Sequence, residues 1–177
     1  MKAAFGPGPH RLAEGRLRRP RGAEVGALAD WVAAMDPWRR LGIGAAALAL
    51  YLDRRDPSLH RFVLDRGGTA EGVLALRWPW LRGPFIELLA VAPALQGAGL
   101  GRAVVAWAAE AARPVARNLW ASAADFNGRA RRFWAGQGFV EVAPLAGLIA
   151  DDGCEILLRR RLDDADVSAR RAGARDT

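Results

Sequence analysis

The chain has 177 residues, 51% of them hydrophobic, which is enough for one domain, and its longest apolar run, 41–52, falls short of the ~20 residues of a membrane span. A single cysteine, Cys154, and two distant histidines rule out an internal disulfide and make a metal site unexpected, and the absence of an apolar N-terminal signal predicts a cytoplasmic protein. The net charge of +7, carried almost entirely by arginine, keeps polyanions such as nucleic acid among the partners to be considered.

The first expected elements are one strand and two helices. Residues 1–10 are rich in Gly and Pro without apolar periodicity and are expected to form a flexible tail, and residues 15–19 are expected to form a short strand. Val25, Leu28, Ala29 and Val32 recur at helical spacing, and Pro37 ends that helix. A second helix is expected over residues 41–53.

Three strands are expected next. Residues 60–78 contain two β-type runs on either side of a Gly-Gly pair, a pattern typical of a hairpin, and residues 84–91 follow as a third strand. These strands are consecutive, so we expect them to pair antiparallel.

The second half alternates helix and strand. We expect a helix from Leu100 that Pro114 stops, a strand over 117–123, a helix over 127–137 ended by Gly138, strands over 139–145 and 154–162, and a flexible tail over 163–177. The order predicts an α+β fold, in which residues 11–162 form a single domain around a mixed, mostly antiparallel sheet of about seven strands with helices on both faces.

Residues 91–101 join a strand to a helix through a loop with very little side chain. The first amides of a helix have no intrahelical acceptor and face the positive end of its dipole, so such a junction binds phosphate. A dinucleotide fingerprint would need a glycine where Arg102 stands, and a P-loop would need a following Gly-Lys-Ser/Thr. The remaining alternatives are a diphosphate site and a tight turn without a ligand.

Two motifs in this half resemble those of the Gcn5-related N-acetyltransferase (GNAT) superfamily. The acyl-CoA-binding motif is matched by Val91, Pro93, Gln96, Gly99 and Gly101, and the second motif by Asn127, Ala130, Phe133, Trp134, Gly138 and Phe139. The resemblance implies an acyl-CoA-dependent N-acyltransferase, an enzyme that moves an acetyl group from acetyl-CoA to a primary amine of a small molecule, amino acid or peptide by direct attack.

The resemblance also implies a cofactor site. The strand over 84–91 would splay from the strand over 117–123, with the pantetheine arm between them, and the amide of Val91 would hold the oxyanion, a contribution of ~3 kcal/mol. The residues expected to bind acetyl-CoA are Leu89, Ala90, Val91, Gln96, Gly97, Ala98, Gly99, Leu100, Gly101, Arg102, Asn127, Phe133 and Trp134.

The acid and base of such a reaction are less clearly marked. Trp134 stands where many members carry a tyrosine, and its indole N–H is not an acid; the only tyrosine, Tyr51, lies in the second helix. Glu87 is our candidate base, because strand alternation would place it on the face of Leu89 and Val91, and the alternative is a carboxylate paired with an arginine. Asp125 is a weaker candidate and is also typical of a turn.

The connection between the first two helices is the expected acceptor wall. It carries aromatic and charged residues, of which we expect Trp31, Asp36 and Trp38 to bind the substrate, with Asp36 holding an ammonium group; the alternative is ordinary packing of a helix connection. Two other functions stay open, a non-catalytic acyl-CoA-binding regulatory module and a basic nucleic-acid-binding protein. A free edge strand would allow a homodimer.

Overall fold

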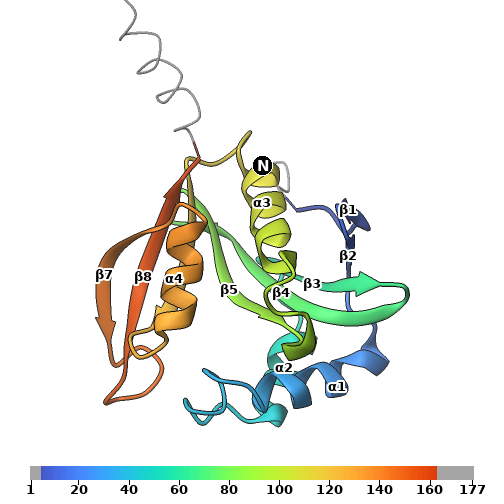
Figure 1. Cartoon of the computed structure of the whole chain (residues 1–177), viewed down its shortest axis with the longest axis horizontal. Helices are drawn as coiled ribbons and strands as arrows, with labels where there is room; N and C mark the ends of the chain where they lie inside the picture. The colour runs from blue at the N-terminus through green and yellow to red at the C-terminus, as the bar shows by residue number, and fades with distance from the viewer. Residues whose placement is uncertain (1–4, 163–177) are drawn as a thin grey trace, which may run out of the picture.

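One hydrogen-bonded sheet runs through residues 5–162, the part of the chain that the computed structural model describes (Figure 1). Its eight strands have the order β1-β2-β3-β4-β5-β6-β8-β7. Their bounds are β1 His10–Leu12, β2 Gly15–Arg18, β3 Leu59–Arg66, β4 Thr69–Trp80, β5 Gly83–Val91, β6 Asn118–Ala124, β7 Val140–Ala146 and β8 Cys154–Arg161. The α+β class and the mixed, mostly antiparallel sheet are confirmed, with one strand more than expected.

A single strand pair of this sheet is parallel. β5 and β6 are in register only at Phe85 with Trp120 and Ile86 with Ala121, and every other pair is antiparallel. Beyond Ile86 the two strands have no further paired residues, although β5 continues to Val91. The sheet is therefore open along the second half of β5.

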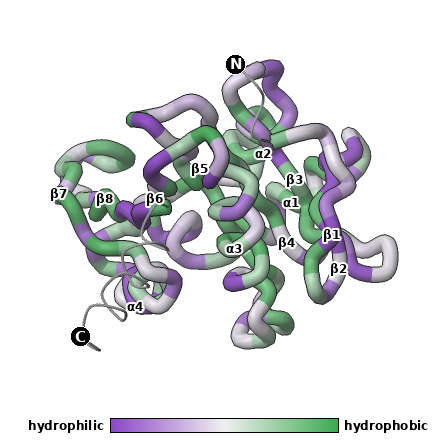
Figure 2. Tube along the Cα trace, turned by 90° about the horizontal axis from the view of Figure 1, so that it is seen from above, coloured by the Kyte–Doolittle hydropathy of each residue, from purple (hydrophilic) through white to green (hydrophobic). Residues whose placement is uncertain are grey.

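Helices cover both faces, as predicted. α1 (Gly22–Ala33) and α2 (Ala45–Asp53) pack on one face and α3 (Leu100–Ala112) on the other, with α4 (Gly128–Gly136) beside β7 and β8 (Figure 1). The four apolar residues predicted for α1, from Val25 to Val32, are all buried. Apolar segments run through the central strands, and the edge strand β7 is also partly apolar, with Val140 and Val142 exposed (Figure 2). None of the helices within residues 5–162 is long and apolar enough to cross a membrane.

The N-terminal segment differs from the expected flexible tail. Phe5 is buried, with its ring 5.6 Å from that of His60 and 5.7 Å from that of Trp107, and His10 begins β1, which pairs with β2. Part of the predicted tail thus belongs to the folded domain, because one aromatic side chain anchors it to the core. The predicted tail over 163–177 lies outside the described residues.

Candidate active site

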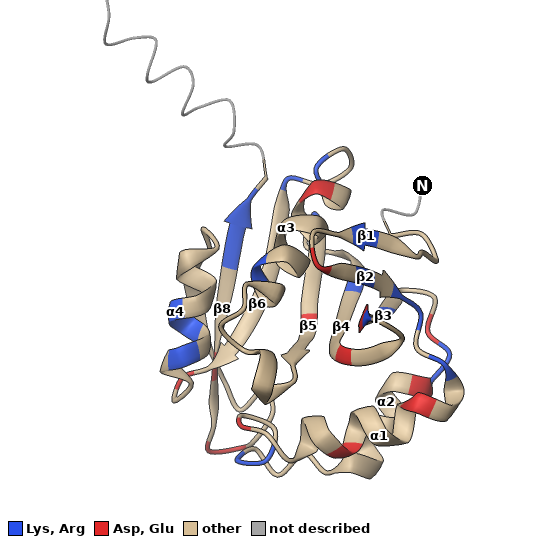
Figure 3. Ribbon diagram, turned by 45° about the vertical axis from the view of Figure 1, so that its right-hand side comes forward, with Lys and Arg blue, Asp and Glu red and all other residues tan. Residues whose placement is uncertain are grey.

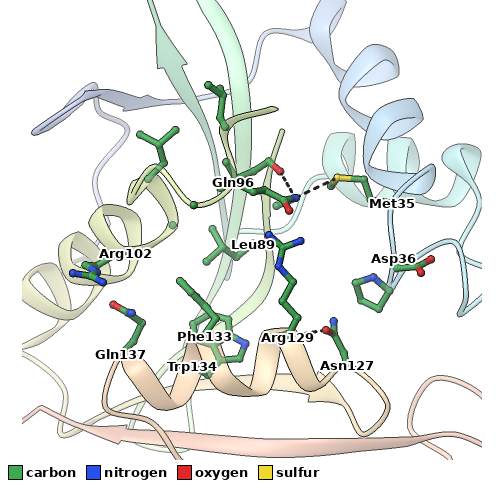
Figure 4. Close-up of a pocket in the computed structure, with 18 of the residues that line it drawn as sticks. Met35, Asp36, Leu89, Gln96, Arg102, Asn127, Arg129, Phe133, Trp134 and Gln137 are labelled. Carbon is green, nitrogen blue, oxygen red and sulfur yellow. Dashed lines mark hydrogen bonds between the residues drawn. The ribbon is translucent and has the colours of Figure 1, made fainter. Parts of the chain in front are cut away.

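A cavity of about 350 Å³ opens at the end of β5 (Figure 4). Four segments line it: the end of β5, the loop before α3 with the first turn of α3, the inner face of α4, and the α1–α2 connection. Its lining residues are Met35, Asp36, Pro37, Trp38, Leu89, Ala90, Val91, Leu95, Gln96, Gly97, Gly99, Leu100, Gly101, Arg102, Asn127, Arg129, Ala130, Phe133, Trp134 and Gln137. Every residue expected to bind acetyl-CoA is among them except Ala98.

The open edge of β5 directs main-chain groups into this cavity. The amide of Ala92 donates to the carbonyl of Glu71 on the β4 side at 2.9 Å. Successive residues of a strand point their amides to opposite sides, so the amides of Leu89 and Val91 face away from β4, toward the gap beside β6. The side chain of Gln96 donates to the Val91 carbonyl at 2.9 Å, which leaves the Val91 amide as the free group.

The loop before α3 offers further free amides. Gly97 and Gly99 have left-handed φ angles of 91° and 84°, which side chains rarely adopt, and a Cβ built on either would meet nothing within 4 Å. Within the described residues, the amides of Gly99, Leu100, Gly101 and Arg102 have no acceptor, whereas Ala103 donates to Gly99. Open main chain, free donors and the positive helix end suit a diphosphate.

Helix α4, which carries part of the second motif, forms the wall of the cavity opposite the loop before α3. The Asn127 side chain accepts from the Ala130 amide at 3.0 Å and so caps the helix. The rings of Phe133 and Trp134 lie 5.1 Å apart; Trp134 is buried and also packs on Phe139, while Phe133 is only partly buried. A Cβ on Gly101 would lie 3.3 Å from the Phe133 ring, so this glycine allows α3 and α4 to approach.

The α1–α2 connection closes the other end of the cavity. Of the three residues expected to bind the substrate, Asp36 and Trp38 line the cavity, whereas Trp31 of α1 packs against the core between α1, α2 and the sheet. Asp36 forms an exposed ion pair with Arg39 at 3.1 Å. The Arg40 guanidinium lies 3.9 Å from the centre of the Phe126 ring and so joins this connection to the turn before α4.

Glu87 does not lie where strand alternation places it. The β4–β5 register shifts so that Leu76 faces Ile86 and Ala75 faces Leu88, which leaves Glu87 as the extra residue of a bulge. Leu89 and Val91 pack on the α3 side, whereas Glu87 accepts a hydrogen bond from Tyr51 of α2 at 2.8 Å. The prediction of a shared face with Leu89 and Val91 was therefore wrong.

The partners of Glu87 form a polar network outside the cavity. Arg77 binds both of its carboxylate oxygens and also donates to Asp56 at 3.0 Å and Ser58 at 2.7 Å. Burial, together with the adjacent Glu87 carboxylate, raises the pKa of Tyr51 above its usual range. The pairing with an arginine, our alternative for Glu87, is what the structure contains.

Asp125 has the geometry of a turn residue. Its carboxylate accepts from the Phe126 amide at 2.6 Å, and its own amide donates to Cys154 of β8. Arg129 and Gln137 are among the cavity residues that the sequence reasoning did not assign to the site. Arg129 lies on α4 and Gln137 is its C-cap residue, and their spacing of three to five residues from Phe133 and Trp134 was the available signal.

Comparisons with known proteins identify a family whose model matches this chain. The model of the acetyltransferase (GNAT) family matches residues 30–139. No curated protein matches the sequence. Within residues 5–162 no group of three or more metal-binding side chains occurs.

Solved structures of acetyltransferases share the fold. An acetyltransferase from Thermus thermophilus superposes with a TM-score of 0.66 at 23% identity, covering 82% of this chain and 95% of its own. Ard1 from Thermoplasma volcanium gives 0.65 at 20% identity, with 82% and 95% covered. The ribosomal-protein-S18-alanine N-acetyltransferase from Escherichia coli gives 0.63 at 16%, with 82% and 92% covered.

Proposed function

Because this chain belongs to the acetyltransferase (GNAT) family, we propose that it moves an acetyl group from acetyl-CoA to a primary amine by direct attack. The observation that carries the proposal is the open edge of β5 beside the start of α3. Free strand amides and free helix amides line one cavity there. The strand amides suit an extended amide-containing arm, and the helix amides suit a diphosphate.

The residues present fit the cofactor. The loop from Gly97 to Arg102 would hold the diphosphate through its amides, with the Arg102 guanidinium adding charge. Phe133 and Trp134 would flank the arm. The Val91 amide would donate to the carbonyl oxygen that gains negative charge during attack, which by analogy with other single donors contributes ~3 kcal/mol. Bound acetyl-CoA supplies the thioester whose acyl carbon the amine attacks.

Few groups in this site can protonate the leaving sulfur or take a proton from the amine. Trp134 can donate a hydrogen bond to a leaving sulfur but cannot protonate it, and a thiol of pKa about 8.5 leaves as thiolate at a cost of only ~2 kcal/mol at neutral pH. Glu87 stays our candidate for the base, acting only through water because it does not line the cavity. Asp36 would hold the ammonium form of the amine until that proton is lost.

The proposal is tested by turnover. Acetyl-CoA is incubated with the protein and a panel of amines, amino acids and short peptides, and free thiol is measured. Thiol release that depends on an amine supports the enzyme. Calorimetric binding of acetyl-CoA without turnover on any amine would instead support the non-catalytic acyl-CoA-binding module, and absence of binding would refute both.

A further inference from the structure

The cavity has two cationic side chains, one from each of the helices α3 and α4 that line it. Of its lining residues, Arg102 and Arg129 are cationic and Asp36 is anionic. Arg102 lies on α3 near Gln137, whereas Arg129 extends from α4 into the cavity toward Gln96 (Figure 4). The two guanidinium groups therefore serve different parts of the cavity.

Arg129 lacks a partner in the described part of the chain, although its helix is rich in arginine (Figure 3). Arg131 on the same helix makes a two-point ion pair with Glu141, at 2.7 and 3.0 Å, and also donates to the Asp125 carbonyl. No such carboxylate is bound to Arg129, which is exposed to solvent at the cavity. A ligand that fills the cavity displaces solvent from the Arg129 guanidinium. The guanidinium then needs a hydrogen-bond acceptor on the ligand.

The position of Arg129 decides which ligand supplies that acceptor. Gln96, toward which Arg129 extends, holds the carbonyl of Val91, so Arg129 reaches the side of the cavity where acyl transfer is proposed. The diphosphate is assigned to the amides from Gly99 to Arg102 at the start of α3, where the other cation, Arg102, lies (Figure 4). An anion near the reacting end thus belongs to the acceptor.

The acceptor end of the cavity also contains the Asp36 carboxylate, which can leave its ion pair with Arg39. The Asp36–Arg39 pair is exposed on both sides, and such pairs contribute little stability, so Asp36 can exchange Arg39 for a ligand ammonium. A planar guanidinium matches a carboxylate through two parallel hydrogen bonds. We propose that the acceptor is a free amino acid, with its carboxylate bound by Arg129 and its amine near Asp36 and the Val91 amide. This inference rests on the proposed function and names its substrate class.

The experiment compares each amino acid with its own carboxamide. Glycine, alanine, leucine, methionine and phenylalanine are tested beside their amides, by steady-state kinetics at saturating acetyl-CoA and by calorimetric titration of the protein loaded with CoA. The acids are expected to be better acceptors and tighter ligands than the amides. In Arg129→Gln this preference should fall about 10- to 100-fold, the range for losing a charged hydrogen-bonded pair, with acetyl-CoA affinity unchanged.

Arg132→Gln is the matched control, because it removes the same charge from the same helix outside the cavity lining and should leave the preference intact. Equal or better use of the amides by the wild-type protein overturns the proposal. So does an Arg129→Gln variant that weakens acetyl-CoA binding and keeps the acid preference. Calorimetry needs no turnover, so an inactive protein that still prefers the acids would refute the proposed function while supporting this ligand class.

Discussion

Replacing Gly99 by alanine tests whether the loop before α3 binds the cofactor through its main chain. Its φ of 84° is left-handed and a built Cβ meets nothing within 4 Å, so the cost to folding is backbone strain alone, about 1–2 kcal/mol. For a chain of this size we expect Tm to fall by about 2–8 °C. The new methyl group stands where the phosphate must approach, and loss of one charged hydrogen bond, about 1.5–3 kcal/mol, weakens acetyl-CoA binding about 10- to 150-fold.

The assay is calorimetric titration with acetyl-CoA, paired with thermal unfolding. Gly68→Ala is the control, because Gly68 also has a left-handed φ, 94°, with open space around its Cβ, but lies in the β3–β4 turn away from the cavity. It should lose similar stability and keep wild-type affinity. If Gly99→Ala binds acetyl-CoA as tightly as the wild type, the glycines serve only the turn and the reasoning fails.

Three further substitutions test the candidate base Glu87, the indole of Trp134 and the buried carboxyl of Glu155 in β8. Glu87→Gln should lower kcat less than about tenfold in steady-state assays, because Glu87 is paired and lies outside the cavity, whereas a direct general base contributes about 10²–10⁴-fold. Trp134→Phe should lower kcat about 10- to 150-fold, the value of one hydrogen bond to a leaving thiolate, and an unchanged kcat would exclude that bond. Burial raises the pKa of Glu155 in the folded protein above its value in the unfolded chain. As pH rises from the unfolded pKa to the folded pKa, ionisation of Glu155 therefore progressively destabilises the fold. Thermal unfolding should therefore show Glu155→Gln more stable than wild type at pH 8, with the difference shrinking toward pH 4.

Features that depend on local geometry could be predicted from the sequence. The buried face of α1 follows from a spacing of 3.6 residues per turn, and all four of its apolar residues are buried. The loop before α3 is equally local, since only glycine adopts left-handed φ without strain at positions 97 and 99. Gly138, with φ of 80°, ends α4 for the same reason.

Features set by distant partners could not be predicted. Strand alternation assumes an unbroken period, and the bulge at Glu87 depends on how β5 pairs with β4, which the sequence of β5 does not contain. β1 has three residues, too few for a pattern, and it forms because β2 offers an edge to pair with. Phe5 is buried for a similar reason, since its ring lies against residues 55 and 102 positions further along the chain, His60 and Trp107.

The single parallel pair explains why the site lies where it does. A strand inside a sheet uses its amides on both sides, but β5 loses its β6 partner after Ile86, so the amides of Leu89 and Val91 have no acceptor in the described chain. Both residues line the cavity, so a ligand that excludes solvent there must supply an acceptor or leave these amides unsatisfied at a cost of about 1–3 kcal/mol each. Gln96 satisfies the Val91 carbonyl and not its amide, so the group left open is a donor. A donor at the end of an interrupted strand selects carbonyl oxygen, and it favours most the state in which that oxygen carries negative charge.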